Sequence, residues 1–358
     1  MVRQILIAIL FLPAVCARAD DNAFFAARRE ALMRRIGGSV AVLQGAPETR
    51  DYAAFRQDNN FYYLTGVETP GALLLLDALD HRAILFLPPR DEPNEKWEGP
   101  KLFAGPEARR QTGVDEVLEL SRFGSEVRKR TDAARGLYIT LSPHELAATS
   151  RDRALLYDSA LRDDPWDARS SRESAFEKSL QALLGPQVPI KDLSPVLDGM
   201  RRVKDAQEIN RLREAGRIGA LGIREAIRSA RPGDTEYQIA AVAAFGFLWN
   251  GALGPAFHPI VGSGPNSCIL HYSRNGRRTA AGDIVVMDFG ADYRYYQSDI
   301  TRTFPVSGKF TDEQAKVYRI VLEAQTAALA KVRPGTTFGD LRAAVKEVLD
   351  RHGVGRYL

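Results

Sequence analysis

The second half of the chain contains the same structural unit twice, and this repeat limits the folds that the chain can adopt. Residues 209–230 and 317–332 both show the apolar spacing that is typical of an amphipathic helix. Each of these segments ends in an Arg-Pro-Gly turn, and a further helix is predicted after each turn. We therefore expect a duplicated fold in this half of the chain.

The first helix pair is followed by a segment with the pattern of strands. Its apolar and β-branched runs are separated by Gly, Pro and Asn, and they cover residues 259–261, 267–271, 283–289 and 295–303. The helix before this segment has Thr235 and Gln238 at the spacing of a capping box. No comparable segment follows the second helix pair, so the sequence predicts that the second domain is truncated.

The first half of the chain alternates between strand and helix patterns, which favours an α/β domain. We expect helices at residues 22–37, 114–123 and 175–184, and strands at residues 39–44, 73–76 and 83–87. With 358 residues the chain exceeds one compact core, so two domains are expected. We predict an N-terminal domain at 22–165, a linker at 166–195 and a second domain at 196–358, α+β in overall class.

Residues 1–19 have the pattern of a secretory signal peptide. Arg3 supplies the positive charge, the apolar run Ile5–Val15 is too short to span a bilayer, and Ala17 and Ala19 give the small-x-small cleavage pattern. A buried N-terminal helix is the alternative. Cys16 is not expected to carry a lipid, because Val15 is an unfavourable residue before a lipidated cysteine. We therefore expect an exported protein, periplasmic or secreted, without a stable membrane anchor.

Composition excludes two further classes of protein. The net charge is only +4, and no run of five or more Lys or Arg occurs, so no nucleic acid partner is expected. Only two cysteines are present, Cys16 and Cys268, so the chain has neither a disulfide framework nor a Cys-x-x-Cys metal site.

Two aspartates carry the strongest chemical pattern. The run Ile284–Met287 predicts a buried strand that ends at Asp288. A turn through residues 293–294 would place Asp288 directly opposite Asp299 in a hairpin, with Cβ atoms about 5 Å apart. Such close carboxylates repel each other unless one divalent ion, or two ions roughly 3.5–4 Å apart, lie between them. Geometry alone leaves an alternative equally open, in which Asp288 caps a turn and Asp299 pairs with Arg302.

These residues and their neighbours resemble the aminopeptidase P, prolidase and creatinase superfamily, whose fold is called the pita-bread fold. The resembling segments are Asp288–Gly290, Ser298–Pro305, His271 and Tyr272 with Asn275, and Val261–Asn266. A further block, Phe55–Gly66, resembles the N-terminal domain of aminopeptidase P. The resemblance implies a creatinase-like α/β domain followed by a pita-bread catalytic domain.

The resemblance also implies a site. In that family five side chains hold two divalent metal ions, usually Mn²⁺. Asp288 matches the aspartate that binds one ion, and Asp299 matches the aspartate that bridges both. His271 matches a histidine near the substrate that stabilises the developing tetrahedral charge. Without the motif, a hydrogen-bonded core histidine would be the simpler interpretation. His258 is expected to be at most a residue of the substrate pocket.

The function implied is release of the N-terminal residue from peptides with proline at the second position. The partner is then an Xaa-Pro peptide, and a homo-oligomer is expected. Trp97 lies where the family's N-terminal domain reaches a neighbouring subunit, although a partly buried surface aromatic is an equal alternative. Prolidase, which cleaves only dipeptides, is the nearest rival activity, and the Phe55–Gly66 block favours aminopeptidase P. Creatinase lacks the metal aspartates.

The sequence departs from the family after Asp299, because one histidine and two glutamates of the ligand set are not identifiable. Glu313, Glu323 and Glu347 lie in predicted helices, and the stretch from His352 has Arg356 at the position of a ligand. Catalytic divalent sites usually need at least three protein ligands. We therefore expect this chain alone to bind metal poorly and to hydrolyse little. A non-catalytic peptide-binding remnant is the alternative.

Overall fold

The computed structural model describes residues 14–49, 54–145 and 149–357, which form two compact units divided between Asp205 and Ala206. Residues 1–13 of the predicted signal peptide lie outside the described residues. Within the described ranges, no helix has both the length and the apolar character needed to cross a membrane.

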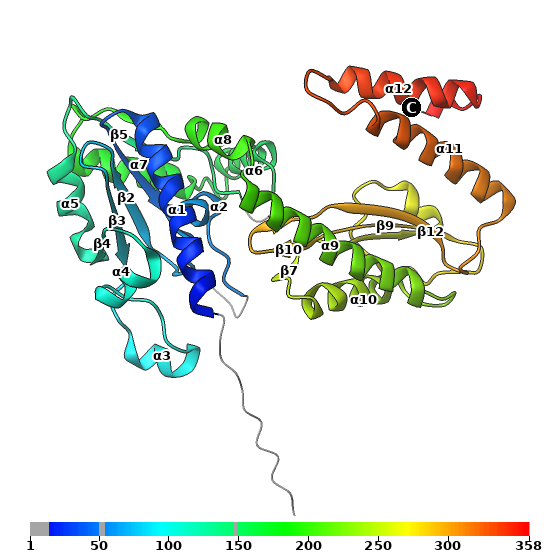
Figure 1. The fold of residues 1–358 in the computed structure, drawn as a ribbon, viewed down its shortest axis with the longest axis horizontal. Coiled ribbons are helices and arrows are strands. Elements are labelled where there is room, and N and C mark those ends of the chain that lie inside the picture. Colours follow the sequence, from blue (N-terminus) through cyan, green and yellow to red (C-terminus); the bar gives the residue numbers. More distant parts are fainter. Residues whose placement is uncertain (1–13, 50–53, 146–148, 358) are drawn as a thin grey trace, which may run out of the picture. The chain divides into compact units, whose positions relative to one another are not determined.

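The first unit is built around one mixed, six-stranded sheet (Figure 1). The strands are β1 (Val40–Gln44), β2 (Leu73–Asp77), β3 (Arg82–Leu87), β4 (Glu116–Glu119), β5 (Leu137–Ile139) and β6 (Ile190–Asp192). Their order is β4-β3-β2-β1-β5-β6. The central strands β1, β2 and β3 pair antiparallel, and the outer strands pair parallel to their neighbours. The strands predicted in the first half of the chain are confirmed.

Helices cover both faces of this sheet because successive residues of a strand point to opposite faces. Leu74 and Leu76 face one apolar cluster, and Leu73 and Leu75 face another. The first cluster includes residues of α1 (Ala14–Ile36), α2 (Asn59–Thr65), α4 (Pro106–Thr112) and α8 (Ser194–Arg202). The second includes residues of α5 (Phe123–Arg130) and α7 (Arg172–Leu184). Two largely exposed helices, α3 (Glu92–Glu98) and α6 (Arg151–Asp163), complete the unit.

Two expectations for this half need correction. The helix predicted at residues 114–123 is wrong, because the chain there forms β4 and then a 3-10 turn at Leu120–Arg122. Pairing of Val117 with Leu85 on the edge of β3 outweighs the local helical pattern. The segment 166–195, expected as a linker, contains α7 and β6, and β6 pairs with β5. It therefore lies within the first unit.

In the second unit, helices α9 (Ala206–Ser229) and α10 (Glu236–Trp249) cover one face of two small sheets (Figure 1). The sheets are ordered β12-β9-β8 and β11-β10-β7. Their strands are β7 (Gly254–Pro255), β8 (Ile260–Ser263), β9 (Ile284–Phe289), β10 (Ala291–Tyr293), β11 (Tyr296–Gln297) and β12 (Ile300–Pro305). Along β9, Val285, Met287 and Phe289 are buried in the apolar cluster shared with the helices. Asp288 therefore belongs to the opposite, half-buried face.

The predicted repeat is present as a second helix pair, α11 (Asp312–Leu329) and α12 (Phe338–Arg351). The predicted capping box at the start of α10 is confirmed, with the Thr235 N–H donating to Oε1 of Gln238 at 2.8 Å. The strand predicted at residues 267–271 is wrong. A 3-10 turn at Gly264–Cys268 ends within this segment, and Ile269 and Leu270 are exposed rather than paired.

Candidate metal centre

The two candidate metal ligands lie on one β-hairpin that runs from β9 through β10 and β11 to β12. Its turn is at Arg294 and Tyr295, which both adopt left-handed backbone conformations, with φ of 49° and 69°. Two successive residues with positive φ are typical of the tight turn that matches the twist of a hairpin. The turn falls one residue later than the sequence predicted.

This later turn changes the pairing of the aspartates. Asp288 lies opposite Thr301, so the expected direct opposition of Asp288 and Asp299 is wrong. A shift of the turn by one residue moves the register by two, and a shift of two residues keeps a side chain on the same face of a sheet. Asp288 and Asp299 therefore become diagonal neighbours and still meet.

The hairpin strands cross closely between the two aspartates, and Gly290 permits this approach. A Cβ atom at Gly290 would lie 1.6 Å from the carbonyl oxygen of Ser298, so no other residue fits there without backbone movement. Ser298 stabilises this close approach of the strands. Its N–H donates to Ala291 O, and its hydroxyl accepts from Ala291 N–H. The motif residues Gly290 and Ser298 thus place Asp299 beside Asp288.

The carboxyl groups of Asp288 and Asp299 face each other, and no cationic side chain in the described part of the chain forms an ion pair with either. Desolvation raises the pKa of Asp299, and the negative charge of Asp288 and a hydrogen bond between the two side chains raise it further. Oδ1 of Asp288 is buried and has no hydrogen-bond partner within the described residues. A bound cation would satisfy this oxygen and remove the repulsion.

The alternative reading of the aspartates does not match the contacts. Among the described residues no ion pair joins Asp299 to Arg302, whose guanidinium donates to its neighbour Thr301 O at 2.8 Å. Asp288 lies within β9 rather than in a turn. The carboxylate pair is therefore available to a ligand.

Both candidate histidines belong to loops beside this hairpin. His271 is exposed at the end of the turn that follows Cys268. His258 contacts the same loop, since its Nε2 lies 2.8 Å from Ser273 O. Ile260, at the start of β8, lies opposite Asp288. The loops of both histidines thus adjoin the strand that carries Asp288.

The candidates rejected from the sequence lie in the second helix pair. Glu313 and Glu323 are in α11, Glu347 is in α12, and His352 caps α12 with its Nε2 2.8 Å from Glu323 Oε2. In the ranges that the structure describes, no group of three or more His, Cys, Asp or Glu side chains is arranged to hold a metal ion. Asp288 and Asp299 thus form an incomplete ligand set here.

Sequence reasoning missed a buried carboxylate, Glu236, at the first position of α10. It accepts hydrogen bonds from the loop that carries His271. A glutamate after an N-cap threonine is common at helix starts, so no local pattern marked this residue. Its complete burial is what distinguishes it.

Comparison with known proteins agrees with both units. The sequence profile of Metallopeptidase family M24 matches residues 210–358, and that of the aminopeptidase P N-terminal domain matches residues 25–138. The Xaa-Pro aminopeptidase of Escherichia coli is 35% identical over 335 residues, covering 91% of this chain and 71% of that protein. The Xaa-Pro aminopeptidase of Haemophilus influenzae is 36% identical, over 79% of this chain and 59% of its own length.

Solved structures show the same relationship. Aminopeptidase P from E. coli with the inhibitor Pro-Leu superposes with a TM-score of 0.75 at 33% identity, over 92% of this chain and 73% of that one. A structure described as an aminopeptidase P from Bacillus anthracis gives a TM-score of 0.78 at 28% identity, over 92% and 76%. The chain belongs to the aminopeptidase P group of metallopeptidase family M24.

Proposed function

We propose that the protein removes the N-terminal residue from peptides whose second residue is proline. The observation that carries this proposal is the meeting of Asp288 and Asp299 at the hairpin crossing, in a chain whose relatives are named Xaa-Pro aminopeptidase. These names favour an aminopeptidase over the dipeptidase that the sequence left open. The chain spans between 59% and 71% of these two relatives, so the activity is proposed for the whole protein.

The carboxylate pair fits one side of a divalent metal centre. The buried Oδ1 of Asp288 lacks a hydrogen-bond donor, and both side chains offer the hard oxygen atoms that Mn²⁺ binds. We propose that the site takes two divalent ions, Mn²⁺ in this protein, and that Asp288 and Asp299 would be among their ligands. One related structure is a zinc-substituted E. coli aminopeptidase P, so Zn²⁺ is the second metal to compare.

Each site residue has a separate proposed role. When bound, the metal ions supply Lewis-acid activation of a water molecule and of the scissile carbonyl. Asp288 and Asp299 hold the ions. His271, exposed beside β8, donates a hydrogen bond to the carbonyl oxygen as negative charge develops there. His258 braces the loop of His271 through Ser273 and lines the substrate pocket.

The test is hydrolysis of Ala-Pro-Leu by the purified chain and by the whole protein, with Mn²⁺ or Zn²⁺, followed by mass spectrometry. Release of alanine, with Ala-Ala-Leu untouched, is expected from the whole protein. The 358-residue chain alone should hydrolyse little, because its described residues supply fewer than three ligands. Equal cleavage of both peptides would refute the proline specificity.

Two matched variants separate metal binding from folding. Asp288→Asn should lower kcat/KM by at least about a hundredfold, since even partners outside the ligand set cost 10–100-fold. Asp292→Asn is the control, because Asp292 is a buried aspartate of the same hairpin that accepts from Tyr295 N–H and Gln297. A similar loss in both variants would assign the effect to the hairpin fold.

We also propose that the protein is exported to the periplasm or secreted, because of the pattern of residues 1–19. Cleavage after Ala19 would leave Asp20 as the first residue. Mass spectrometry of the protein from its source checks this, and an intact N-terminus would contradict it.

A homo-oligomer is proposed as well, with Trp97 of α3 as a contact residue. Its side chain is 89% exposed, and exposed tryptophans are enriched at protein interfaces. Light scattering after size-exclusion chromatography should show that Trp97→Ala lowers the molar mass. An unchanged mass would leave Trp97 a surface aromatic.

A further inference from the structure

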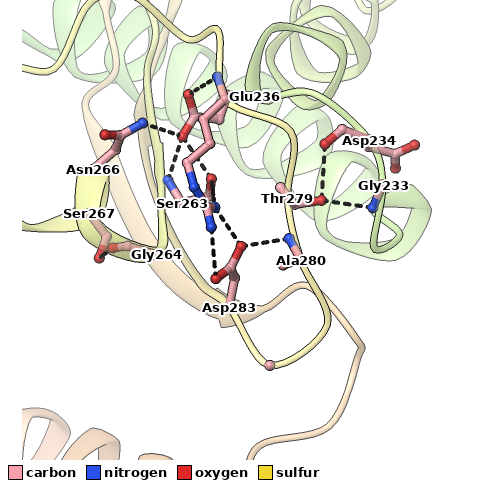
Figure 2. A network of polar contacts seen from close by, with 12 residues as sticks. Gly233, Asp234, Glu236, Ser263, Gly264, Asn266, Ser267, Thr279, Ala280 and Asp283 are labelled. Atoms are coloured by element: carbon pink, nitrogen blue, oxygen red, sulfur yellow. Dashed lines mark hydrogen bonds and ion pairs between the residues drawn. The ribbon is translucent and has the colours of Figure 1, made fainter.

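Glu236 is a completely buried carboxylate that makes no direct ion pair among the described residues, although the guanidinium of Arg277 acts on it electrostatically. Hydrogen bonds satisfy it instead. Oε1 accepts from Ser263 N–H at 2.7 Å, from the Ser263 hydroxyl at 2.7 Å and from Nδ2 of Asn266 at 3.1 Å. Oε2 accepts from the Tyr272 hydroxyl at 2.8 Å and from Arg277 N–H at 2.9 Å. Figure 2 shows Ser263 and Asn266 directed at this carboxylate.

All these donors belong to one segment, residues 263–277, which begins at the last residue of β8 and covers the first part of the connection to β9. Ser263 and Arg277 are its two ends, so one side chain holds both ends together. The backbone of α10 adds two contacts, because Glu236 N–H donates to Arg277 O and Tyr237 N–H donates to Asn275 O. The first turn of α10 and the Glu236 side chain thus clamp the segment.

A second layer of contacts closes this clamp. Arg277 donates from Nη1 to the Ser263 hydroxyl at 2.8 Å and to Oδ2 of Asp283 at 2.5 Å. Asp283 in turn accepts from Ala280 N–H at 2.6 Å (Figure 2). The charged pair therefore fixes the Ser263 hydroxyl from the side opposite to Glu236.

The clamped segment carries His271 next to one of the five donors. His271 is exposed, whereas Tyr272 is buried through its hydrogen bond to Glu236. Asn275 then joins the segment to β8, since its Oδ1 accepts from Val261 N–H at 3.0 Å. Val261 follows Ile260, which lies opposite Asp288. The clamp consequently sets where His271 stands beside the strand of Asp288.

We propose that Glu236 is a positioning residue, which holds the segment 263–277 so that His271 meets the peptide substrate beside Asp288. The contacts of Glu236 alone support its hold on the segment 263–277. That His271 meets a peptide substrate rests on the proposed function. Only a carboxylate serves here, because every partner is a donor. A glutamine would place its N–H₂ group where one carboxylate oxygen now accepts, facing either the donors Ser263 and Asn266 or the donors Tyr272 and Arg277. Donor would then face donor, and hydrogen bonds would be lost.

Hydrogen–deuterium exchange of the full chain tests the fixing of the segment. Glu236→Gln should speed exchange of amides in 264–277 about tenfold and leave 284–305 unchanged, because a lost charged hydrogen bond opens a segment locally. Glu208→Gln is the matched control. Glu208 is also buried and accepts from a tyrosine hydroxyl, that of Tyr296 at 2.9 Å. Tyr272→Phe removes one donor and should speed exchange of the same amides about threefold. If Glu236→Gln does not fold, this variant shows whether the hydrogen bonds to Glu236 fix the segment.

A double-mutant cycle tests the link to His271. Affinity for Ala-Pro-Leu is taken from KM, which is measured on the whole protein with Mn²⁺ for the wild type, Glu236→Gln, His271→Ala and the double variant. Glu236→Gln should weaken binding about tenfold, and it should add nothing once His271 is absent, because non-additivity marks residues that act together. Additive losses would overturn the positioning role. If the wild type binds no peptide, the proposed function fails, and the exchange experiment still decides whether Glu236 fixes the segment.

Discussion

The two helix pairs of the second unit share one sequence pattern but differ in what covers them. The pair α9–α10 buries its apolar residues against β8, β9 and β12, and it includes Ile218, Ala243 and Phe247. In α11 and α12 the buried apolar residues are only Ile320, Ala324, Ala344 and Val348. Val317, Val321, Leu329 and Val332 are more than half exposed. An amphipathic pattern therefore predicts a helix with one apolar face. It does not predict which residues elsewhere in the sequence pack against that face.

The largest expected difference between the pairs comes from removing one core side chain from each. Phe247 is completely buried, and the centroid of its ring lies 5.0 Å from that of the Phe289 ring. Phe247→Ala should lower the free energy of unfolding by about 3–5 kcal/mol. Ile320→Ala should cost about 2 kcal/mol or less, because Ile320 packs in a two-helix contact that can relax. Urea unfolding measures both, and equal losses would contradict the contrast in cover.

Two helical glycines sharpen the contrast, because the same substitution should have opposite signs. A Cβ atom at Gly222 of α9 would lie 2.5 Å from the Phe247 ring and 2.7 Å from Ala243 O. Gly222→Ala should therefore destabilise the protein by about 1–3 kcal/mol. At Gly339 of α12 the nearest atom would be the Thr337 hydroxyl at 3.4 Å. Gly339→Ala should stabilise by about 0.5 kcal/mol, since it reduces the freedom of the unfolded chain. Thermal unfolding measures both variants. A change in melting temperature of the same sign in both would contradict the expected contrast.

Local patterns in the sequence predicted much of this unit. The helix pairs, their Pro-Gly turns and the capping box at Thr235 depend on neighbouring residues, so they could be read directly. The hairpin was predicted with the right faces but the wrong register. Its turn uses left-handed conformations at Arg294 and Tyr295, which neither residue type favours, so the turn position was not visible in the sequence.

Contacts between distant residues could not be predicted. Glu236 meets Ser263 and Arg277, which follow it by 27 and 41 residues. No pattern in the sequence joins these positions, and the same holds for the pairing of Val117 with β3. The carboxylate pair was accessible because Asp288 and Asp299 share one hairpin and a motif that resembles a known family.

The carboxylate pair gives the first helix pair and its sheet a pH dependence of a sign that the second pair does not share. In α12 the pKa of Asp340 is lowered by hydrogen bonds from Thr337. The pKa of Asp299 is raised in the folded chain. At this site the folded state then binds more protons than the unfolded state at acidic pH, so the contribution of Asp299 to stability is greatest below its unfolded pKa and falls as the pH rises through its folded pKa. Asp288→Asn should remove this loss, because an amide carries no charge and can donate to Asp299.

Thermal unfolding from pH 4 to pH 8 with a chelator present checks this expectation. Asp288→Asn should exceed the wild type in melting temperature at neutral pH, and the difference should disappear in acid. Adding Mn²⁺ at neutral pH should raise the melting temperature of the wild type and leave Asp288→Asn unchanged. A wild type that is more stable than the variant at neutral pH without metal would show that the pair is not repulsive.

The smallest effect on stability is expected on the exposed face of α11, where the effect on association should be clear. Val321 is 57% exposed, so Val321→Glu should change the free energy of unfolding by less than about 0.5 kcal/mol. It should nevertheless lower self-association in light scattering, because it interrupts an exposed apolar face. Gln325→Glu adds the same charge at an exposed polar position of α11 and is the matched control. If both variants lower association equally, charge is responsible, and the uncovered apolar face of α11 is not what draws the chains together.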